Sequence, residues 1–167
     1  MKKGRLFLPL CCALAVFLGT NASQGAELPA SPSVEDATSA DAVRQMQDQK
    51  LNFVLMDARS LRNYQAEHIE GAILPMISEY YEKQALFQAN VISVPPDVDE
   101  FLKRSVEKYP KDTKIITYCN KDCHASEVLM SKLRLLGFSD VKFMQSGIDA
   151  WKEKGYPVAA PAVDLAK

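Results

Sequence analysis

Residues 113–138 read TKIITYCNKDCHASEVLMSKLRLLGF. The apolar run "KIITY" is typical of a buried strand, and leucines at helical spacing before Gly137 predict a helix from about residue 125 to residue 136. Cys119 lies at the turn from the strand into the loop before this helix. Unpaired N–H groups at a helix N-terminus attract negative charge, so a cysteine at this turn indicates thiolate chemistry.

Strand and helix patterns alternate along the rest of the chain. Buried strands are predicted at 52–57, 114–118 and 141–144, with a brief strand at 72–75, and helices at 39–50, 60–68, 78–90, 97–109 and 147–155. This alternation predicts an α/β fold with a mainly parallel sheet of about five strands and helices on both faces. Ligands of such sheets bind beyond the carboxyl ends of the strands, which is where Cys119 lies.

The first 26 residues have the pattern of a secretory signal peptide. Basic residues at positions 2, 3 and 5 precede an apolar run from Leu6 to Gly19, which is shorter than the roughly 20 residues of a membrane span. We therefore predict a signal peptide at 1–26, a flexible leader at 27–38, one domain at 39–160 and a tail at 161–167. The signal peptide predicts that the protein is secreted across the inner membrane into a bacterial periplasm. The alternative is an uncleaved N-terminal membrane anchor.

Composition limits the partners of the mature chain. Removal of residues 1–26 leaves 17 basic and 21 acidic residues, a net charge of −4. This balance does not favour binding to nucleic acid or to an anionic membrane. Of four cysteines only Cys119 and Cys123 would remain, which is too few for a disulfide scaffold.

Two segments together resemble a known family. Residues 55–75, LMDARSLRNYQAEHIEGAILP, resemble the opening of a rhodanese (sulfurtransferase) domain, and residues 115–158 resemble its second half. The matching positions are Asp57-x-Arg59, Tyr64, His68-Ile69-x-Gly71-Ala72, the cysteine loop, Leu136-Gly137-Phe138 and Gly147-Ile148-x-Ala150-Trp151. These motifs occur in the order typical of the family. Together the two matching segments cover nearly the whole predicted domain.

The resemblance implies a single three-layer rhodanese-like domain with sulfurtransferase activity. Cys119 would accept a sulfane sulfur and carry it as a persulfide. The donor would be a small persulfide, polysulfide or thiosulfate, and the acceptor a thiol; a protein partner is also possible, and no cofactor is expected. We expect the backbone amides of residues 120–124 to hold the anion, and the helix N-terminus to lower the pKa of Cys119 toward neutrality.

The cysteine loop departs from the family pattern at three positions. Asp122 stands where a glycine is usual, His124 where an arginine is usual, and Ala125 where a serine or threonine is usual. The loop thus loses a permanent cation and gains a carboxylate, although Lys121 restores some positive charge. We expect Asn120, Lys121, Asp122 and His124 to contact the substrate, and thiosulfate, a dianion, to be a poor donor.

Cys123 has several possible roles. It is a candidate resolving thiol that attacks a Cys119 persulfide, a shield against irreversible oxidation, or a small loop residue without a redox role. A thiol-disulfide switch formed by Cys119 and Cys123, and a non-catalytic binding module, are the alternative functions. Metal binding by these cysteines with His124 would need further ligands that the sequence does not supply, so no metal is expected.

Arg59 has two interpretations. It either pairs with Asp57 or lines the mouth of the pocket as a substrate-binding residue, because it follows the end of a predicted strand.

Overall fold

A computed structural model describes residues 32–159. Its centre is a four-stranded sheet in which all neighbouring strands are parallel, in the order β1-β5-β4-β2. The strands are β1 (Ala37–Thr38), β2 (Val54–Asp57), β4 (Ile115–Tyr118) and β5 (Val141–Met144). A separate antiparallel pair joins β3 (His68–Ile69) to β6 (Val158–Ala159). The α/β class and the parallel sheet predicted from the sequence are confirmed.

The sheet has four strands rather than the predicted five. The segment 72–75 forms only an isolated bridge, in which Ile73 pairs with Met56 through hydrogen bonds to the two neighbouring residues of β2. Pro75 follows two residues later and has no N–H to donate, so the pairing cannot continue into a ladder. The fourth strand, β1, comes from residues that the sequence assigned to the flexible leader.

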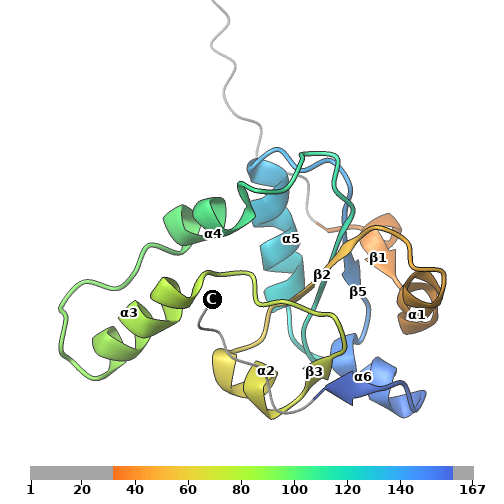
Figure 1. The fold of residues 1–167 in the computed structure, drawn as a ribbon, viewed down its shortest axis with the longest axis horizontal. Coiled ribbons are helices and arrows are strands. Elements are labelled where there is room, and N and C mark those ends of the chain that lie inside the picture. Colours follow the sequence, from red (N-terminus) through yellow and green to blue (C-terminus); the bar gives the residue numbers. More distant parts are fainter. Residues whose placement is uncertain (1–31, 160–167) are drawn as a thin grey trace, which may run out of the picture.

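Helices cover both faces of this sheet (Figure 1). They are α1 (Ala40–Asp48), α2 (Leu61–Ala66), α3 (Ser78–Gln88), α4 (Val98–Val106), α5 (Ala125–Leu135) and α6 (Gly147–Glu153), with a short 3₁₀ helix η1 (Val34–Asp36). Successive strand residues face opposite sides, so Ile116 packs with α1 and α6, whereas Ile115 packs with α4 and α5. The result is the three-layer arrangement that the sequence predicted.

Caps define several of the helix ends. The Ser39 side chain accepts the N–H of Ala42 at the start of α1, the Ser60 side chain accepts the N–H of Asn63 at the start of α2, and Asp97 caps α4. Just after the C-terminal end of α5, Gly137 adopts a φ of +91°, a conformation that favours glycine.

The helix α3 and the loop after it form an arm that projects from the sheet (Figure 1). None of the α3 residues is buried, and apolar side chains such as Val91 and Val94 are exposed in the following loop. The arm is attached to the domain through α4, where Arg104 pairs with Glu79 at 2.9 Å.

None of the helices described within residues 32–159 is both long and apolar enough to cross a membrane. The predicted signal peptide and the predicted tail at 161–167 lie outside the described residues.

Candidate active site

Cys119 directly follows β4, a central strand with β5 on one side and β2 on the other. The loop from Asn120 to His124 then leads into α5. The sequence therefore predicted correctly that the cysteine lies at the carboxyl end of a buried strand and before a helix. This edge of a parallel sheet is where ligands of α/β folds bind.

A buried hydrogen-bond network fixes the strand end next to Cys119. The hydroxyl of Tyr118 donates to Oδ2 of Asp57 at 2.8 Å and accepts the N–H of Ile69 at 3.1 Å. Arg59 completes the network through Nε and Nη2, both of which bond the Asp57 carboxylate. A second bond from Nη2 reaches the carbonyl of Glu67 at 2.6 Å. Each polar group of this buried cluster therefore has a partner.

The Arg59 side chain is buried in an ion pair and is not open to solvent. Its side chain is 5% exposed and its guanidinium is paired with Asp57, one of the two interpretations of the sequence. Contact between Arg59 and substrate stays a prediction, which this geometry does not favour.

The start of α6 contacts the backbone of Cys119. The N–H of Ile148 donates to the Cys119 carbonyl at 2.8 Å. Gly147 packs against the same peptide, with a φ of +53° and no room for a side chain. The Gly-Ile pair at 147–148, noted as part of the family pattern, thus positions the cysteine loop.

The sulfur of Cys119 faces carbonyl oxygens. Its Sγ lies 2.6 Å from the carbonyl oxygen of Cys123 and 3.4 Å from that of Asn120, so the thiol donates its hydrogen in this arrangement. The donors on the other side belong to Ser126, whose Oγ lies 3.4 Å from the sulfur and whose backbone N–H also bonds it.

Burial raises the pKa of the Cys119 thiol above its ordinary value, and the neighbouring Cys123 thiol raises it further. The hydrogen bonds from Ser126 lower this pKa only in part. The expectation that the helix N-terminus lowers the pKa of Cys119 is therefore wrong for this structure. The physical reason is that desolvation disfavours the charged thiolate, and only one residue at the start of α5 offers donors to the sulfur.

The amides of the loop do not all point toward Cys119. The N–H of Lys121 donates to the carboxylate of Asp149 in α6 at 2.8 Å, and the N–H of Cys123 donates to the carbonyl of Asn120 at 3.3 Å. The predicted cradle of amides from residues 120–124 is thus partly occupied by acceptors within the protein.

Some of the side chains predicted to contact substrate line a hollow of about 320 Å³. Asn120, Lys121, Asp122 and Cys123 line it, together with Ser126, Glu127 and residues 143–146. His124 is not among the lining residues; its side chain is 82% exposed and its Nδ1 lies 3.2 Å from Glu127. Four of the predicted loop residues are thus brought together, while His124 and Arg59 are not.

Two residues of the site were missed by sequence reasoning. Ser126 is buried beside the cysteine, and Asp149 binds the loop from 28 positions away. Ser126 lies one position after Ala125, where the family usually has serine or threonine. Allowing a shift of one residue in the family motif would have identified it from the sequence. Asp149 gave no local signal, because its contact depends on where α6 packs.

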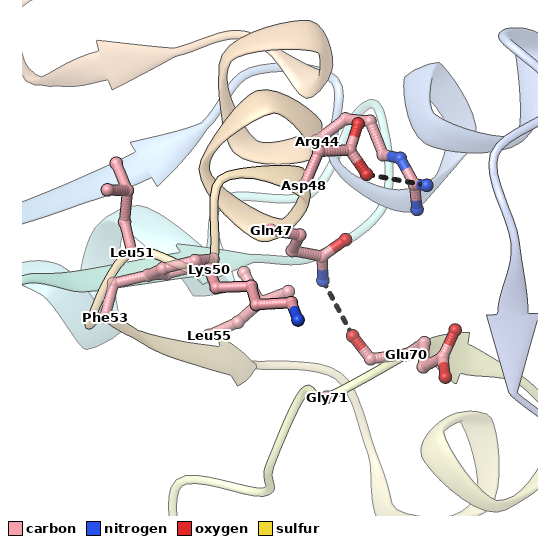
Figure 2. Close-up of a pocket in the computed structure, with 9 residues that line it drawn as sticks. All are labelled: Arg44, Gln47, Asp48, Lys50, Leu51, Phe53, Leu55, Glu70 and Gly71. Carbon is pink, nitrogen blue, oxygen red and sulfur yellow. Dashed lines mark hydrogen bonds and ion pairs between the residues drawn. The ribbon is translucent and has the colours of Figure 1, made fainter.

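Another hollow, of about 540 Å³, lies between α1 and the turn after β3 (Figure 2). Its lining includes none of the residues of the cysteine loop. The side chain of Gln47 donates to the carbonyl of Glu70 at 2.8 Å, and Arg44 pairs with Asp48 at 2.8 Å, as the close-up shows. The bond from Gln47 connects α1 to the turn at Gly71, whereas the Arg44–Asp48 pair lies within α1.

The residues from 32 to 159 contain no cluster of three or more ligating side chains suited to a metal ion. Both cysteines of this region are free thiols.

Comparison with known proteins agrees with this geometry. The sequence profile described as "Rhodanese-like domain" matches residues 39–154. The chain belongs to the rhodanese-like domain family. A search of curated proteins found no match.

Solved structures show the same fold. The rhodanese-like chain aligns with the BH2092 protein from Bacillus halodurans at 20% identity and a TM-score of 0.57, covering 78% of this chain and 83% of that one. The Alr3790 protein from Anabaena sp. aligns at 21% identity and 0.56, covering 75% and 94%. SseA from Escherichia coli, described as a 3-mercaptopyruvate sulfotransferase with the rhodanese fold, aligns at 16% identity and 0.53, covering 78% and 53%. At these identities the similarity establishes the fold.

Proposed function

We propose that this rhodanese-like protein is a sulfurtransferase that carries sulfane sulfur as a persulfide on Cys119. The observation that carries the proposal is the position of Cys119, at the carboxyl end of the central strand β4 and before α5 in a rhodanese-like fold. The Oγ and backbone N–H of Ser126 are the donors that would hold the terminal sulfur of the persulfide.

The reaction is an exchange of one sulfur atom between thiols. Cys119, as thiolate, attacks the terminal sulfur of a persulfide RS–SH, the S–S bond breaks, and the thiol RSH leaves with the proton. A second thiol then removes the terminal sulfur from Cys119 in the same way. The exchange leaves the total oxidation state unchanged, so it requires no external oxidant or reductant.

The charges around the loop favour a donor other than thiosulfate. Two carboxylates, Asp122 and Glu127, line the hollow beside the single cation Lys121, and the Asp149 carboxylate accepts the backbone N–H of Lys121. Each carboxylate repels a dianion, and the position that usually supplies an arginine is filled by a histidine directed toward Glu127. A persulfide with a lower charge meets less repulsion.

The experiment compares two donors on the reduced full-length protein. We expect turnover with cysteine persulfide and a thiosulfate:cyanide rate at least about tenfold lower. Asp149→Asn should raise the thiosulfate rate by a few fold without a comparable change for the persulfide, because it removes a negative charge from the loop. Asp140→Asn, a surface carboxylate paired with Lys114, is the matched control and should change neither rate. A wild-type thiosulfate rate equal to the persulfide rate would refute the donor preference, and loss of activity with both donors in wild type would refute the sulfurtransferase itself.

Export to the periplasm is a separate proposal that depends on residues 1–26. A fusion of residues 1–38 to a reporter active only outside the cytoplasm should show activity, and deletion of 1–26 should abolish it. Retention of the full-length protein in the cytoplasm would contradict this localisation.

A further inference from the structure

The two cysteines of the site differ in accessibility. Cys119 is 1% exposed and is not among the residues lining the 320 Å³ hollow, whereas Cys123 is half-buried and lines it. A small molecule in this hollow therefore contacts Cys123 and not Cys119.

The two sulfurs are also neighbours. The Cys123 side chain is within hydrogen-bonding reach of the Cys119 thiol, and the Cys119 sulfur contacts the Cys123 carbonyl at 2.6 Å. Both thiols are free, so each can attack the terminal sulfur of a persulfide carried by the other. A sulfur atom exchanged between them therefore passes within a single loop, between residues four positions apart.

Cys123 receives a hydrogen bond that a charged sulfur would strengthen. The N–H of Ala125 donates to its Sγ at 3.4 Å, while Cys119 is confined by two carbonyl oxygens on one side. The Cys123 sulfur thus faces a donor whereas the Cys119 sulfur faces acceptors, so the two sulfurs have opposite hydrogen-bond environments.

We propose that Cys123 is a relay thiol: sulfane sulfur enters and leaves the protein through Cys123 and is exchanged internally with Cys119. This inference rests on the proposed function of Cys119. It assigns to Cys123 a role different from that of a resolving thiol, which would release sulfide and leave a disulfide.

Each relay step is balanced. The Cys123 thiolate attacks the terminal sulfur of RS–SH, forming Cys123–S–SH and releasing RSH. The Cys119 thiolate then attacks the terminal sulfur of Cys123–S–SH, forming Cys119–S–SH and restoring the Cys123 thiol. One S–S bond breaks and one forms in each step, and the proton passes to the departing thiolate, so no oxidant or reductant is required.

The hollow indicates the class of the donor. Its lining combines the Lys121 ammonium with the carboxylates of Asp122 and Glu127, the polar groups of Asn120 and Gln145, and the apolar side chains of Phe143 and Met144. Opposite charges on a short apolar surface suit a zwitterion, such as an amino-acid persulfide, better than a dianion. A hollow of about 320 Å³ is of the size that holds a small molecule.

The test measures which cysteine is loaded first. Reduced full-length protein is mixed with cysteine persulfide, quenched with an alkylating agent at increasing times and digested with trypsin. Cleavage after Lys121 places Cys119 in residues 115–121 and Cys123 in residues 122–132, so the mass of one added sulfur is located unambiguously. In wild type we expect the Cys123 peptide to gain sulfur before the Cys119 peptide.

Two variants separate the steps. In Cys119→Ser, Cys123 should still be loaded at the wild-type rate. In Cys123→Ser, loading of Cys119 in the native protein should fall by about tenfold, because its sulfur has no direct access to the hollow. Loading of Cys119 in urea should be equal in wild type and Cys123→Ser, which shows that the remaining thiol is chemically intact, and thermal unfolding confirms that each variant folds.

The outcomes distinguish the relay from the function on which it rests. Wild-type loading of Cys119 in Cys123→Ser would overturn the relay and leave the persulfide function standing. Release of sulfide with loss of two hydrogens across the pair would also overturn it, in favour of a resolving thiol. Absence of added sulfur on either cysteine of wild type would overturn the proposed function and the relay together.

Discussion

Gly147 packs so closely against Cys119 that a β-carbon at position 147 would lie 1.8 Å from the Cys119 carbonyl oxygen. The same carbonyl accepts the N–H of Ile148 at 2.8 Å. The start of α6 therefore forms one wall of the cysteine loop, and the position of the reactive cysteine depends on a residue 28 positions later in the chain. Only glycine fits, because the obstacle is backbone and cannot rotate away.

Replacing Gly147 by alanine should disrupt the site. The added methyl group must displace the Cys119 peptide, and alanine also disfavours the φ of +53°, so we expect a loss of about 3 kcal/mol or more in the free energy of unfolding. Gly155→Ala is the matched control, since its φ is +70° but nothing lies within 4 Å of the added carbon. The control should lose only about 1 kcal/mol in urea unfolding. Equal losses in the two variants would show that backbone strain alone is responsible.

Tyr118→Phe should destabilise the strand end that carries Cys119. It removes the hydroxyl that donates to Asp57 and leaves the buried N–H of Ile69 without an acceptor. We expect a cost of about 2 kcal/mol, measured by urea unfolding. Tyr109→Phe, at a half-buried tyrosine with no hydroxyl hydrogen bond to the described residues, should stay within about 0.5 kcal/mol of wild type. An unchanged free energy of unfolding in Tyr118→Phe would mean that this hydrogen-bond network does not stabilise the fold.

Asp36→Asn should lower stability in a pH-dependent way. The hydrogen bond from the Arg134 guanidinium holds the pKa of Asp36 well below its usual range, with a further contribution from the backbone N–H of Ser33. Because the folded pKa is below the unfolded value of about 3.9, the stabilisation is fully present above about pH 4 and is lost as the pH falls below it.

Urea unfolding at pH 7 should show a deficit of about 1 kcal/mol for Asp36→Asn, and the deficit should shrink at pH 3. Asp48→Asn, which removes an exposed pair with Arg44, serves as the control with an expected change below about 0.5 kcal/mol. A deficit that stayed constant with pH would contradict the assigned ion pair.

Ser126→Ala should make Cys119 less reactive. Burial already raises the pKa of Cys119, and Ser126 provides the hydrogen bonds that partly lower it. Removing its hydroxyl should therefore shift the midpoint of Cys119 alkylation to still higher pH. We expect the rate at pH 7.5 to fall about threefold, followed on the tryptic peptide 115–121.

Ser131→Ala is the control on the same helix, because its hydroxyl bonds the Glu127 carbonyl and does not contact Cys119. An unchanged Cys119 midpoint in Ser126→Ala, or an equal shift in Ser131→Ala, would be evidence against a direct effect of Ser126 on the sulfur.

Local sequence determined the secondary structure, the α/β class and the place of Cys119 at a strand-to-helix turn. These features depend on the spacing of apolar residues within one segment, as in residues 114–118 and 125–136, and that spacing is readable without knowing what packs against it. The number of strands was overestimated because one bridge at Ile73 has the same local pattern as a strand. The edge strand β1 was missed because two residues carry too little pattern.

Only the tertiary structure decided the chemical environment of the cysteine. Burial by the surrounding layers, the carbonyls directed at its sulfur, the Asp149 carboxylate on the loop and the wall at Gly147 all come from elements far apart in the chain. A helix N-terminus by itself predicts a lowered thiol pKa, but desolvation depends on everything that packs around the sulfur and outweighs it here. The sequence located the thiol, and long-range packing raised its pKa and decided that Cys123 rather than Cys119 lines the hollow.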